Sequence, residues 1–215
     1  MSATLKPKVL FIGFGHLAKS LLSKKLLNSV NIHALNSKGV IKNINLKKKI
    51  LNFNNDYKYI FFLVRPKTFL TLGNQFQKYL SKETLVISCM AGIKLSTIEK
   101  TLKSKKIVRI MPNVMALNNK SQTHIYMKNK NLFDSKLKKI LSTFGTIINV
   151  RNEDQINFAT SVFGSGPAFI AYIVNIFVKA SKKLAKPYYM KEKDVIELFK
   201  NVLETNYSVS YTHLR

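Results

Sequence analysis

The sequence has few of the features that mark a secreted or membrane protein. Cys89 is the single cysteine among 215 residues, so no internal disulfide can form, and we expect a reducing, cytoplasmic compartment. The first residues, MSATLKPK, lack the apolar run and cleavage site of a secretory signal. The longest apolar run, at 168–180, is interrupted by Asn175 and is shorter than the roughly 20 residues that span a bilayer. It predicts a buried core helix and no membrane partner.

Acidic residues are scarce, because 10 Asp and Glu face 36 Lys and Arg, which gives a net charge of +26. A charge of this size attracts polyanions. Only four of the basic residues are arginines, at 65, 109, 151 and 215, and the lysines are spread over every segment. Specific contacts to bases and phosphates favour the planar guanidinium of arginine. We therefore expect small phosphorylated ligands and no specific nucleic-acid binding.

Over the first 150 residues, short apolar runs alternate with segments whose apolar residues recur at helical spacing. The runs predict strands at 9–13, 31–35, 59–64, 85–89, 107–111, 124–127 and 146–150, and helical spacing predicts helices at 16–27, 67–80, 95–103 and 134–144. Several of the strands are apolar on both faces. This alternation favours an α/β fold built on a Rossmann-type, doubly wound sheet.

The pattern changes after Val150, where strands cease. Residues 153–206 have helical patterns only, with a break at 164–167. We therefore expect a nucleotide-binding domain over 1–151 and a partial, all-helical dimerisation domain over 152–215. So short a helical segment has difficulty in burying a core of its own, which predicts packing against a second copy of the chain.

A glycine motif, G-x-G-x-x-A, joins the first strand to the first helix. Gly13 and Gly15 fill its glycine positions and Ala18 its last position. In this context the first glycine makes a tight turn, the second lets the backbone approach a pyrophosphate, and the alanine keeps the helix close to the sheet. Amides at the start of the helix favour the anion. The motif predicts dinucleotide binding, against the alternative of a purely structural turn.

The kind of dinucleotide is indicated by an absence. Residues 1–55 contain no Asp or Glu, so no carboxylate there can accept the adenine ribose 2′-hydroxyl of NAD. Asn36, Ser37 and Lys38 follow the second strand instead, and an amide, a hydroxyl and a cation suit the 2′-phosphate of NADP. A polar turn without a ligand is the alternative.

Two more stretches follow predicted strands, at the edge where open α/β sheets bind ligands. In the first, Pro66 ends a strand abruptly, so that Val64 and Arg65 can line a cleft; the same residues could simply terminate the strand. In the second, Asn113 offers both a donor and an acceptor that could fix a nicotinamide amide, or it could form a simple turn.

Five motifs between residues 8 and 169 resemble those of the pyrroline-5-carboxylate reductase family. They are, in chain order, GFGHLA, LVRP, ISCMAGI, RIMPNVMAL and FGSGPAF. The resemblance implies reduction of a cyclic imino acid, 1-pyrroline-5-carboxylate, to L-proline by NADPH, the last step of proline synthesis. It also implies a homo-oligomer held together by the C-terminal helices.

The family's functional residues carry over to positions in these motifs. Cofactor binding is implied for Gly13, Gly15, His16, Leu17, Ala18, Asn36, Ser37, Lys38, Val64, Arg65, Pro66, Ala91, Gly92 and Asn113, and substrate binding for Ser165, Gly166 and Pro167. Ala91 and Gly92 would shape the cleft floor. His16, where the family usually has Asn, either bonds the pyrophosphate or is a solvated loop histidine.

The end of the sequence departs from the family. Its members continue through a T-S-P-G-G-T-T loop that holds the imino acid, whereas residues 208–215 here, SVSYTHLR, do not. We expect a truncated chain with impaired activity, and no catalytic acid is assigned. The histidines share no ligand spacing with Cys89, so no metal is expected. Two alternatives stay open: a related reductase of another imine or carbonyl, and a non-catalytic protein that binds NADP or a polyanion.

Overall fold

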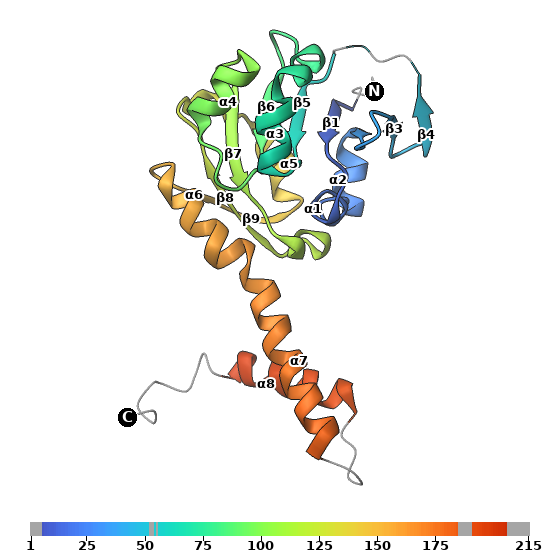
Figure 1. Cartoon of the computed structure of the whole chain (residues 1–215), viewed down its shortest axis with the longest axis vertical. Helices are drawn as coiled ribbons and strands as arrows, with labels where there is room; N and C mark the ends of the chain where they lie inside the picture. The colour runs from blue at the N-terminus through green and yellow to red at the C-terminus, as the bar shows by residue number, and fades with distance from the viewer. Residues whose placement is uncertain (1–5, 52–53, 55, 185–190, 206–215) are drawn as a thin grey trace. The chain divides into compact units, whose positions relative to one another are not determined.

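The computed structural model describes residues 6–51, 54, 56–184 and 191–205 (Figure 1). The chain divides into two compact units, Met1–Ser165 and Gly166–Arg215. All strands among the described residues belong to the first unit, and the described part of the second unit is helical. Residues 208–215, where the sequence departs from the family, lie outside the described residues.

A single sheet forms the centre of the first unit, with the strand order β4-β3-β2-β1-β5-β6-β7-β8-β9. Its strands are β1 (Lys8–Ile12), β2 (Asn31–Leu35), β3 (Ile41–Asn43), β4 (Lys48–Ile50), β5 (Tyr59–Phe62), β6 (Leu85–Ser88), β7 (Ile107–Met111), β8 (Ser121–Tyr126) and β9 (Gly145–Asn149). The five strands β2, β1, β5, β6 and β7 run parallel to their neighbours in this series. Because β1 lies between β2 and β5, the sheet has a topological switch point at β1, where ligands bind in such folds.

Helices pack on both faces of the sheet. They are α1 (His16–Ser20), α2 (Lys24–Ser29), α3 (Pro66–Leu72), α4 (Leu95–Leu102), α5 (Ser135–Ser142) and α6 (Asp154–Ala159), with the 3₁₀ helices η1 (Gly73–Tyr79), η2 (Val114–Asn118) and η3 (Lys130–Leu132) and the π-helix η4 (Thr160–Gly164). Leu26 and Leu137 belong to one apolar cluster, whereas Phe69 and Ile98 belong to another. This arrangement confirms the predicted Rossmann-type α/β fold.

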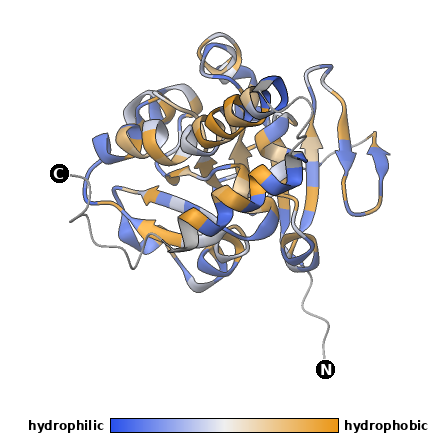
Figure 2. Ribbon diagram, turned by 90° about the horizontal axis from the view of Figure 1, so that it is seen from below, coloured by the Kyte–Doolittle hydropathy of each residue, from blue (hydrophilic) through white to orange (hydrophobic). Residues whose placement is uncertain are grey.

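The structure differs from the sequence-based prediction in the first half of the sheet. The single helix expected over 16–27 is two helices, because Ser23 accepts the Leu26 N–H at 3.2 Å and caps a new start. Strands β3 and β4 were not expected. They form an antiparallel extension of β2, and this hairpin, at the right-hand edge in Figure 2, carries mostly hydrophilic residues.

The helical break expected at 164–167 is instead a π-helical segment, η4, followed by a turn at Ser165. The last strand ends at Asn149, close to where strands were expected to cease, but α6 and η4 belong to the first compact unit. The functional division at residue 151, into a nucleotide-binding domain and a dimerisation domain, stays a prediction.

The second unit contains α7 (Gly166–Leu184) and α8 (Glu192–Thr205). Val178 and Val195 are buried in this unit, and the rings of Phe177 and Phe199 meet edge to face at 5.0 Å between centroids. The expectation that 168–180 is a buried core helix is wrong within this chain. A single partner helix covers one side of α7, and Tyr172 stays 66% exposed.

One segment in the described part of the chain, Asp154–Lys183, is long and apolar enough to cross a membrane by length and composition. It has 30 residues, so it is longer than the apolar run on which the sequence-based argument rested. A core helix of a soluble protein passes the same test. The absence of a membrane partner stays a prediction.

Candidate functional site

Backbone hydrogen bonds bring three strand ends together at the switch point. The Gly13 N–H donates to the Leu35 carbonyl at 3.1 Å, and the Leu63 N–H donates to the Ile12 carbonyl at 2.8 Å. The turn after β1 is therefore fixed between the ends of β2 and β5. All three strands are parallel, so their carboxyl ends share one edge of the sheet.

A cleft of about 690 Å³ opens at this edge. Its lining consists of Ile12, Gly13, Phe14, Gly15, Leu35, Asn36, Ser37, Gly39, Leu63, Val64, Arg65, Thr68, Leu72, Gln75, Phe76, Lys78 and Tyr79. We call this the β1 cleft. Six of its lining residues were expected from the sequence to bind a cofactor: Gly13, Gly15, Asn36, Ser37, Val64 and Arg65. The lining contains basic side chains and no carboxylate, which favours an anionic ligand.

The two glycines of the motif differ in what the fold requires of them. Gly13 has a φ of +96°, and a Cβ added there would lie 2.9 Å from the backbone of Leu63 and Val64. At Gly15 an added Cβ would meet nothing within 4 Å. The protein itself therefore needs a glycine at position 13, whereas the space at Gly15 is open, as the close approach of a ligand would require.

The other motif residues lie in α1. Ala18 is buried in the core beneath this helix, which fits its expected packing role. Leu17 packs partly against the same cluster, and His16, the first residue of α1, is exposed. None of these three side chains lines the β1 cleft. The first backbone N–H groups of a helix have no partner within it. The donors that α1 can offer to a ligand are therefore these groups and the N–H groups of the turn before the helix.

The turn after β2 is shaped by Asn36. Its Oδ1 accepts the N–H groups of Lys38 at 2.9 Å and of Val40 at 3.0 Å. This side-chain-to-backbone pattern is a common turn-forming device. Ser37 and Lys38 are exposed on the turn. Lys38 lies between Ser37 and Gly39, which line the β1 cleft, but it is not itself part of the lining.

Val64 and Arg65 line the β1 cleft, and Pro66 begins α3 directly behind them. Arg65 is the N-cap residue of α3, with its carbonyl accepting the Phe69 N–H at 3.1 Å. Pro66 has no backbone N–H, and at the first helical position such a group would have no partner within the helix. The proline thus serves as the expected strand terminator and also as a helix start.

Ala91 and Gly92, which were expected to shape the cleft floor, lie beyond the β1 cleft lining. Ala91 and Gly92 are in the loop between β6 and α4, where Gly92 has a φ of +70° and open space around it. Ala91 packs against a small cluster with Met111 and Ile156. Their loop follows β6, so it lies at the same edge of the sheet as the β1 cleft.

Asn113 is 8% exposed, and three of its hydrogen bonds fix its backbone N–H and its side-chain amide. Its backbone N–H donates to Ser121 Oγ at 3.0 Å, its Oδ1 accepts the Met115 N–H at 3.0 Å, and its Nδ2 donates to the Phe163 carbonyl at 3.0 Å. These contacts use one of the two Nδ2 hydrogens. The predicted contact to a nicotinamide amide stays a prediction.

The expected substrate residues lie where the two units divide. The Ser165 N–H donates to the Thr160 carbonyl at 3.1 Å and closes the π-helical turn. Ser165 is the last residue of the first unit, and Gly166 begins the second as the first residue of α7, with Pro167 next to it. Their roles in substrate binding stay predictions.

Sequence reasoning missed one wall of the β1 cleft. Thr68 and Leu72 of α3 and Gln75, Phe76, Lys78 and Tyr79 of η1 line it. Lys78 Nζ lies 5.2 Å from the centroid of the Tyr79 ring. Helical spacing was visible in this segment, but spacing does not reveal which face of a helix meets a ligand.

Cys89 is buried, and this burial raises the pKa of its thiol well above the usual range. A thiol held neutral in this way is a poor nucleophile. Among the residues that the structure describes, no group of three or more His, Cys, Asp or Glu side chains is placed to hold a metal ion.

Comparison with known proteins gives relatives over most of the chain. No family model matches the chain. A pyrroline-5-carboxylate reductase of Staphylococcus aureus (strain COL) is 29% identical over 91% of this chain and 76% of its own length. The enzyme of the same name from Staphylococcus epidermidis (strain ATCC 12228) is 28% identical over the same shares. The resemblance indicated by the five motifs is confirmed.

Solved structures share the fold. A Plasmodium falciparum pyrroline carboxylate reductase with NADP bound has a TM-score of 0.71 and 22% identity, and the match covers 94% of this chain and 80% of that one. A 1-pyrroline-5-carboxylate reductase from Streptococcus pyogenes has a TM-score of 0.69 and 18% identity, with 96% and 82% covered.

Proposed function

We propose that this chain, a divergent relative of the pyrroline-5-carboxylate reductases, is an NADPH-dependent oxidoreductase that reduces 1-pyrroline-5-carboxylate to L-proline. The observation that carries the proposal is the open backbone at Gly15, in the β1 cleft at the switch point of the sheet. The relatives, which align with 91% of the chain, supply the reaction class.

The cofactor assigned to the β1 cleft is NADPH. The pyrophosphate would lie against the turn from Gly13 to Gly15, where the open space and the first backbone amides of α1 suit an anion. The 2′-phosphate would lie at the turn of Asn36, Ser37 and Lys38. No acidic residue occurs before Asp56, so this turn has no nearby carboxylate in sequence to repel the phosphate.

Hydride transfer to a C=N bond depends on orientation. NADPH, when bound, supplies the hydride. Efficient transfer requires the donor and acceptor carbons to lie about 3 to 3.5 Å apart, and the residues of the site would orient the two molecules. We assign Val64, Arg65, Ala91, Gly92 and Asn113 to the ribose and nicotinamide side. A protonated imine is already electrophilic, so no further acid is assigned among the described residues.

The substrate would be held by its carboxylate and ring nitrogen near Ser165, Gly166 and Pro167. This small-molecule partner is a cyclic imino acid, which is anionic at its carboxylate. The assignment of these three residues rests on the FGSGPAF motif.

A homo-oligomer formed through the C-terminal helices is part of the proposal. Apolar side chains that are exposed in the second unit include Phe169, Ile170, Tyr172, Ile173, Ile176 and Phe177 of α7 and Ile196, Leu198 and Val202 of α8. Monomeric soluble proteins rarely expose apolar patches of this kind. A second copy of α7 and α8 would cover them, which also fits a cytoplasmic protein.

Light scattering tests the oligomer. Ile176→Lys places a charge on a residue of α7 that is 48% exposed in the single chain, and we expect it to reduce the measured mass to that of fewer copies. Lys179→Gln, on the exposed part of the same helix, is the matched control and leaves the mass unchanged. A wild-type protein that is a monomer contradicts the proposal.

Activity and binding test the function. NADPH and NADH are titrated at two salt concentrations, and NADPH oxidation is then followed with 1-pyrroline-5-carboxylate. We expect a discrete site that is tighter for NADPH and a substrate-dependent loss of NADPH. Turnover only with another imine or carbonyl would indicate a related reductase. Affinity for DNA alone, with a steep salt dependence, would indicate the polyanion-binding alternative.

A further inference from the structure

Arg109 is a buried cation with one partner. It lies in β7, is 1% exposed, and its Nη1 donates to Glu153 Oε1 at 2.5 Å. Its Nε and Nη2 have no hydrogen-bond partner among the residues that the structure describes. A buried charge is costly unless it is paired. Arg109 therefore depends on Glu153 for the compensation of its charge.

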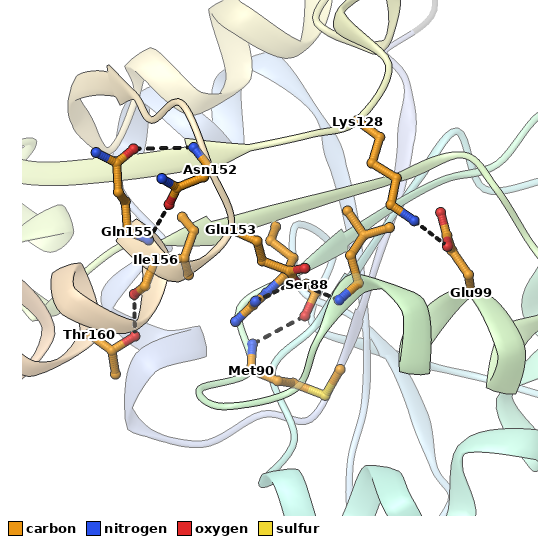
Figure 3. Close-up of polar contacts among 11 residues, drawn as sticks. Ser88, Met90, Glu99, Lys128, Asn152, Glu153, Gln155, Ile156 and Thr160 are labelled. Atoms are coloured by element: carbon orange, nitrogen blue, oxygen red, sulfur yellow. Dashed lines mark hydrogen bonds and ion pairs between the residues drawn. The ribbon is translucent and has the colours of Figure 1, made fainter.

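Glu153 joins three elements that are far apart in the sequence. Its Oε1 also accepts the backbone N–H of Leu95, the first residue of α4, at 2.5 Å. Lys94, the N-cap residue of α4, makes no side-chain capping bond. The carboxylate of Glu153, which is itself the N-cap residue of α6, therefore caps α4 in its place. Figure 3 shows Glu153 at the centre of these polar contacts.

Hydrogen bonds hold both ends of the loop between β6 and α4. At its start, Ser88 Oγ accepts the Met90 N–H at 3.3 Å. At its end, Leu95 is bound by Glu153. Between them lie Ala91, which packs against the cluster of Met111 and Ile156, and Gly92, which has a φ of +70° and open space around it.

The backbone of Glu153 begins the segment that contacts Asn113. The Glu153 carbonyl accepts the Ile156 N–H at 3.0 Å, and α6 continues into η4. The Phe163 carbonyl of η4 accepts the Asn113 Nδ2 hydrogen. Glu153 thus binds the end of the loop that contains Ala91 and Gly92, and it begins the segment that bonds Asn113.

We propose that Glu153, held by Arg109, is a positioning residue for the nicotinamide half of the cofactor site. It sets where the 89–94 loop and the Asn113 amide lie at the carboxyl ends of β6 and β7. This inference rests on the proposed function. The adenine end of the site, at the turn of Asn36 after β2, is held by other contacts, so the two halves should respond differently to a change at Glu153.

The test compares NADPH with 2′,5′-ADP, which has the adenine and 2′-phosphate but no nicotinamide. Glu153→Gln keeps the side-chain shape and removes the charge opposite Arg109. We expect the dissociation constant of NADPH to rise about tenfold, below the roughly hundredfold effect of a 1 Å misplacement on reaction rate. The dissociation constant of 2′,5′-ADP should stay within about twofold, as for a group outside the altered region.

Glu99→Gln is the matched control. Glu99 lies on α4 and pairs with Lys128 at 2.8 Å, and its side chain is 24% exposed against 21% for Glu153. The chemical change and the exposure are therefore alike, but Glu99 holds no buried arginine. Both dissociation constants should keep their wild-type values in this variant.

Four outcomes would overturn the inference. An equal weakening of NADPH and 2′,5′-ADP means that Glu153 supports the whole domain. A lower melting temperature with both constants unchanged means a structural role only. A wild-type chain that binds 2′,5′-ADP but gains nothing from the nicotinamide half removes the inference alone, whereas a wild-type chain that binds neither ligand removes the proposed function as well. If Glu153→Gln does not fold, Glu153→Asp, which keeps the charge, is measured with the same criteria.

Discussion

A Cβ atom at Gly13 would lie 2.9 Å from the carbonyl carbon and oxygen of Leu63, the residue that follows β5. Real Cβ atoms essentially never approach backbone this closely. Gly13 also has a φ of +96°, a region that other residues rarely adopt. The contact between β1 and β5 therefore requires glycine, whatever ligand the cleft binds.

The first prediction separates the two glycines of the motif. Gly13→Ala should lower the free energy of unfolding by about 1–3 kcal/mol, the cost of a strained backbone conformation. Gly15→Ala should lower it by less than about 1 kcal/mol, as expected at an N-cap position, and should weaken NADPH binding at least tenfold because the methyl group fills the open space. Urea unfolding and NADPH titration measure both. Unchanged NADPH affinity in Gly15→Ala would contradict the cofactor site.

The second prediction concerns selectivity for the 2′-phosphate. Lys38→Glu replaces a cation on the turn after β2 with an anion, and we expect it to weaken NADPH binding while NADH binding changes little. Lys48→Glu on β4 makes the same change in net charge and is the control. An equal loss for both dinucleotides in Lys38→Glu would show that this lysine acts only through the overall charge.

The third prediction rests on a buried histidine, His33 of β2. Its Nδ1 lies 2.9 Å from the Tyr57 hydroxyl, and its Nε2 lies 3.3 Å from Asn43 Nδ2. The Asn43 Oδ1 accepts the Leu46 N–H, which fixes the amide with its Nδ2 toward the ring. His33 is thus neutral, with its proton on Nδ1. Burial lowers the pKa of His33, and the charge of Lys8 lowers it further.

Stability should therefore fall in acid. The unfolded chain takes up a proton at a pKa of about 6.5, whereas the folded chain resists it, so the free energy of unfolding decreases as the pH falls below about 6.5. One such group contributes at most about 1.4 kcal/mol per pH unit. Urea unfolding between pH 8 and pH 5 measures the slope. Burial also lowers the pKa of His124, so His33→Gln should reduce the slope and leave a remainder.

The fourth prediction concerns Cys89. Because burial raises its pKa and leaves it 6% exposed, we expect negligible reaction with a thiol reagent at pH 8 in the folded protein. The thiol should react fully once urea unfolds the chain. Fast labelling of the native protein would show that the loop after β6 opens.

The central strands could be predicted from the sequence because burial on both faces leaves continuous apolar runs. The bounds of β2 and β7 match the expected 31–35 and 107–111. The hairpin of β3 and β4 was missed, since strands of three residues with lysines on an edge have no such run. The start of α2 was missed as well. Ser23 lies inside the expected helix at 16–27, and its Oγ also bonds the Thr143 carbonyl at 3.5 Å, a contact between residues 120 apart in the sequence.

The residues of the candidate site also fall into those that the sequence predicted and those that it did not. Gly13, Gly15 and the turn at Asn36 were found because their roles depend on local backbone geometry next to a strand end. The η1 wall of the β1 cleft was not found, because its contribution depends on how a 3₁₀ helix packs beside β5. Glu153 was seen only as the start of the helical region, since its partners Leu95 and Arg109 lie 58 and 44 residues away.

The amino-acid sequence by itself determined the alternation of strands and helices, the glycine turn and the excess of positive charge, because each follows from local patterning or composition. Only the tertiary structure decided which strand ends meet, which glycine has open space above it, and which carboxylate compensates the buried arginine. Those relationships join residues that are distant along the chain, and packing of the sheet brings them together.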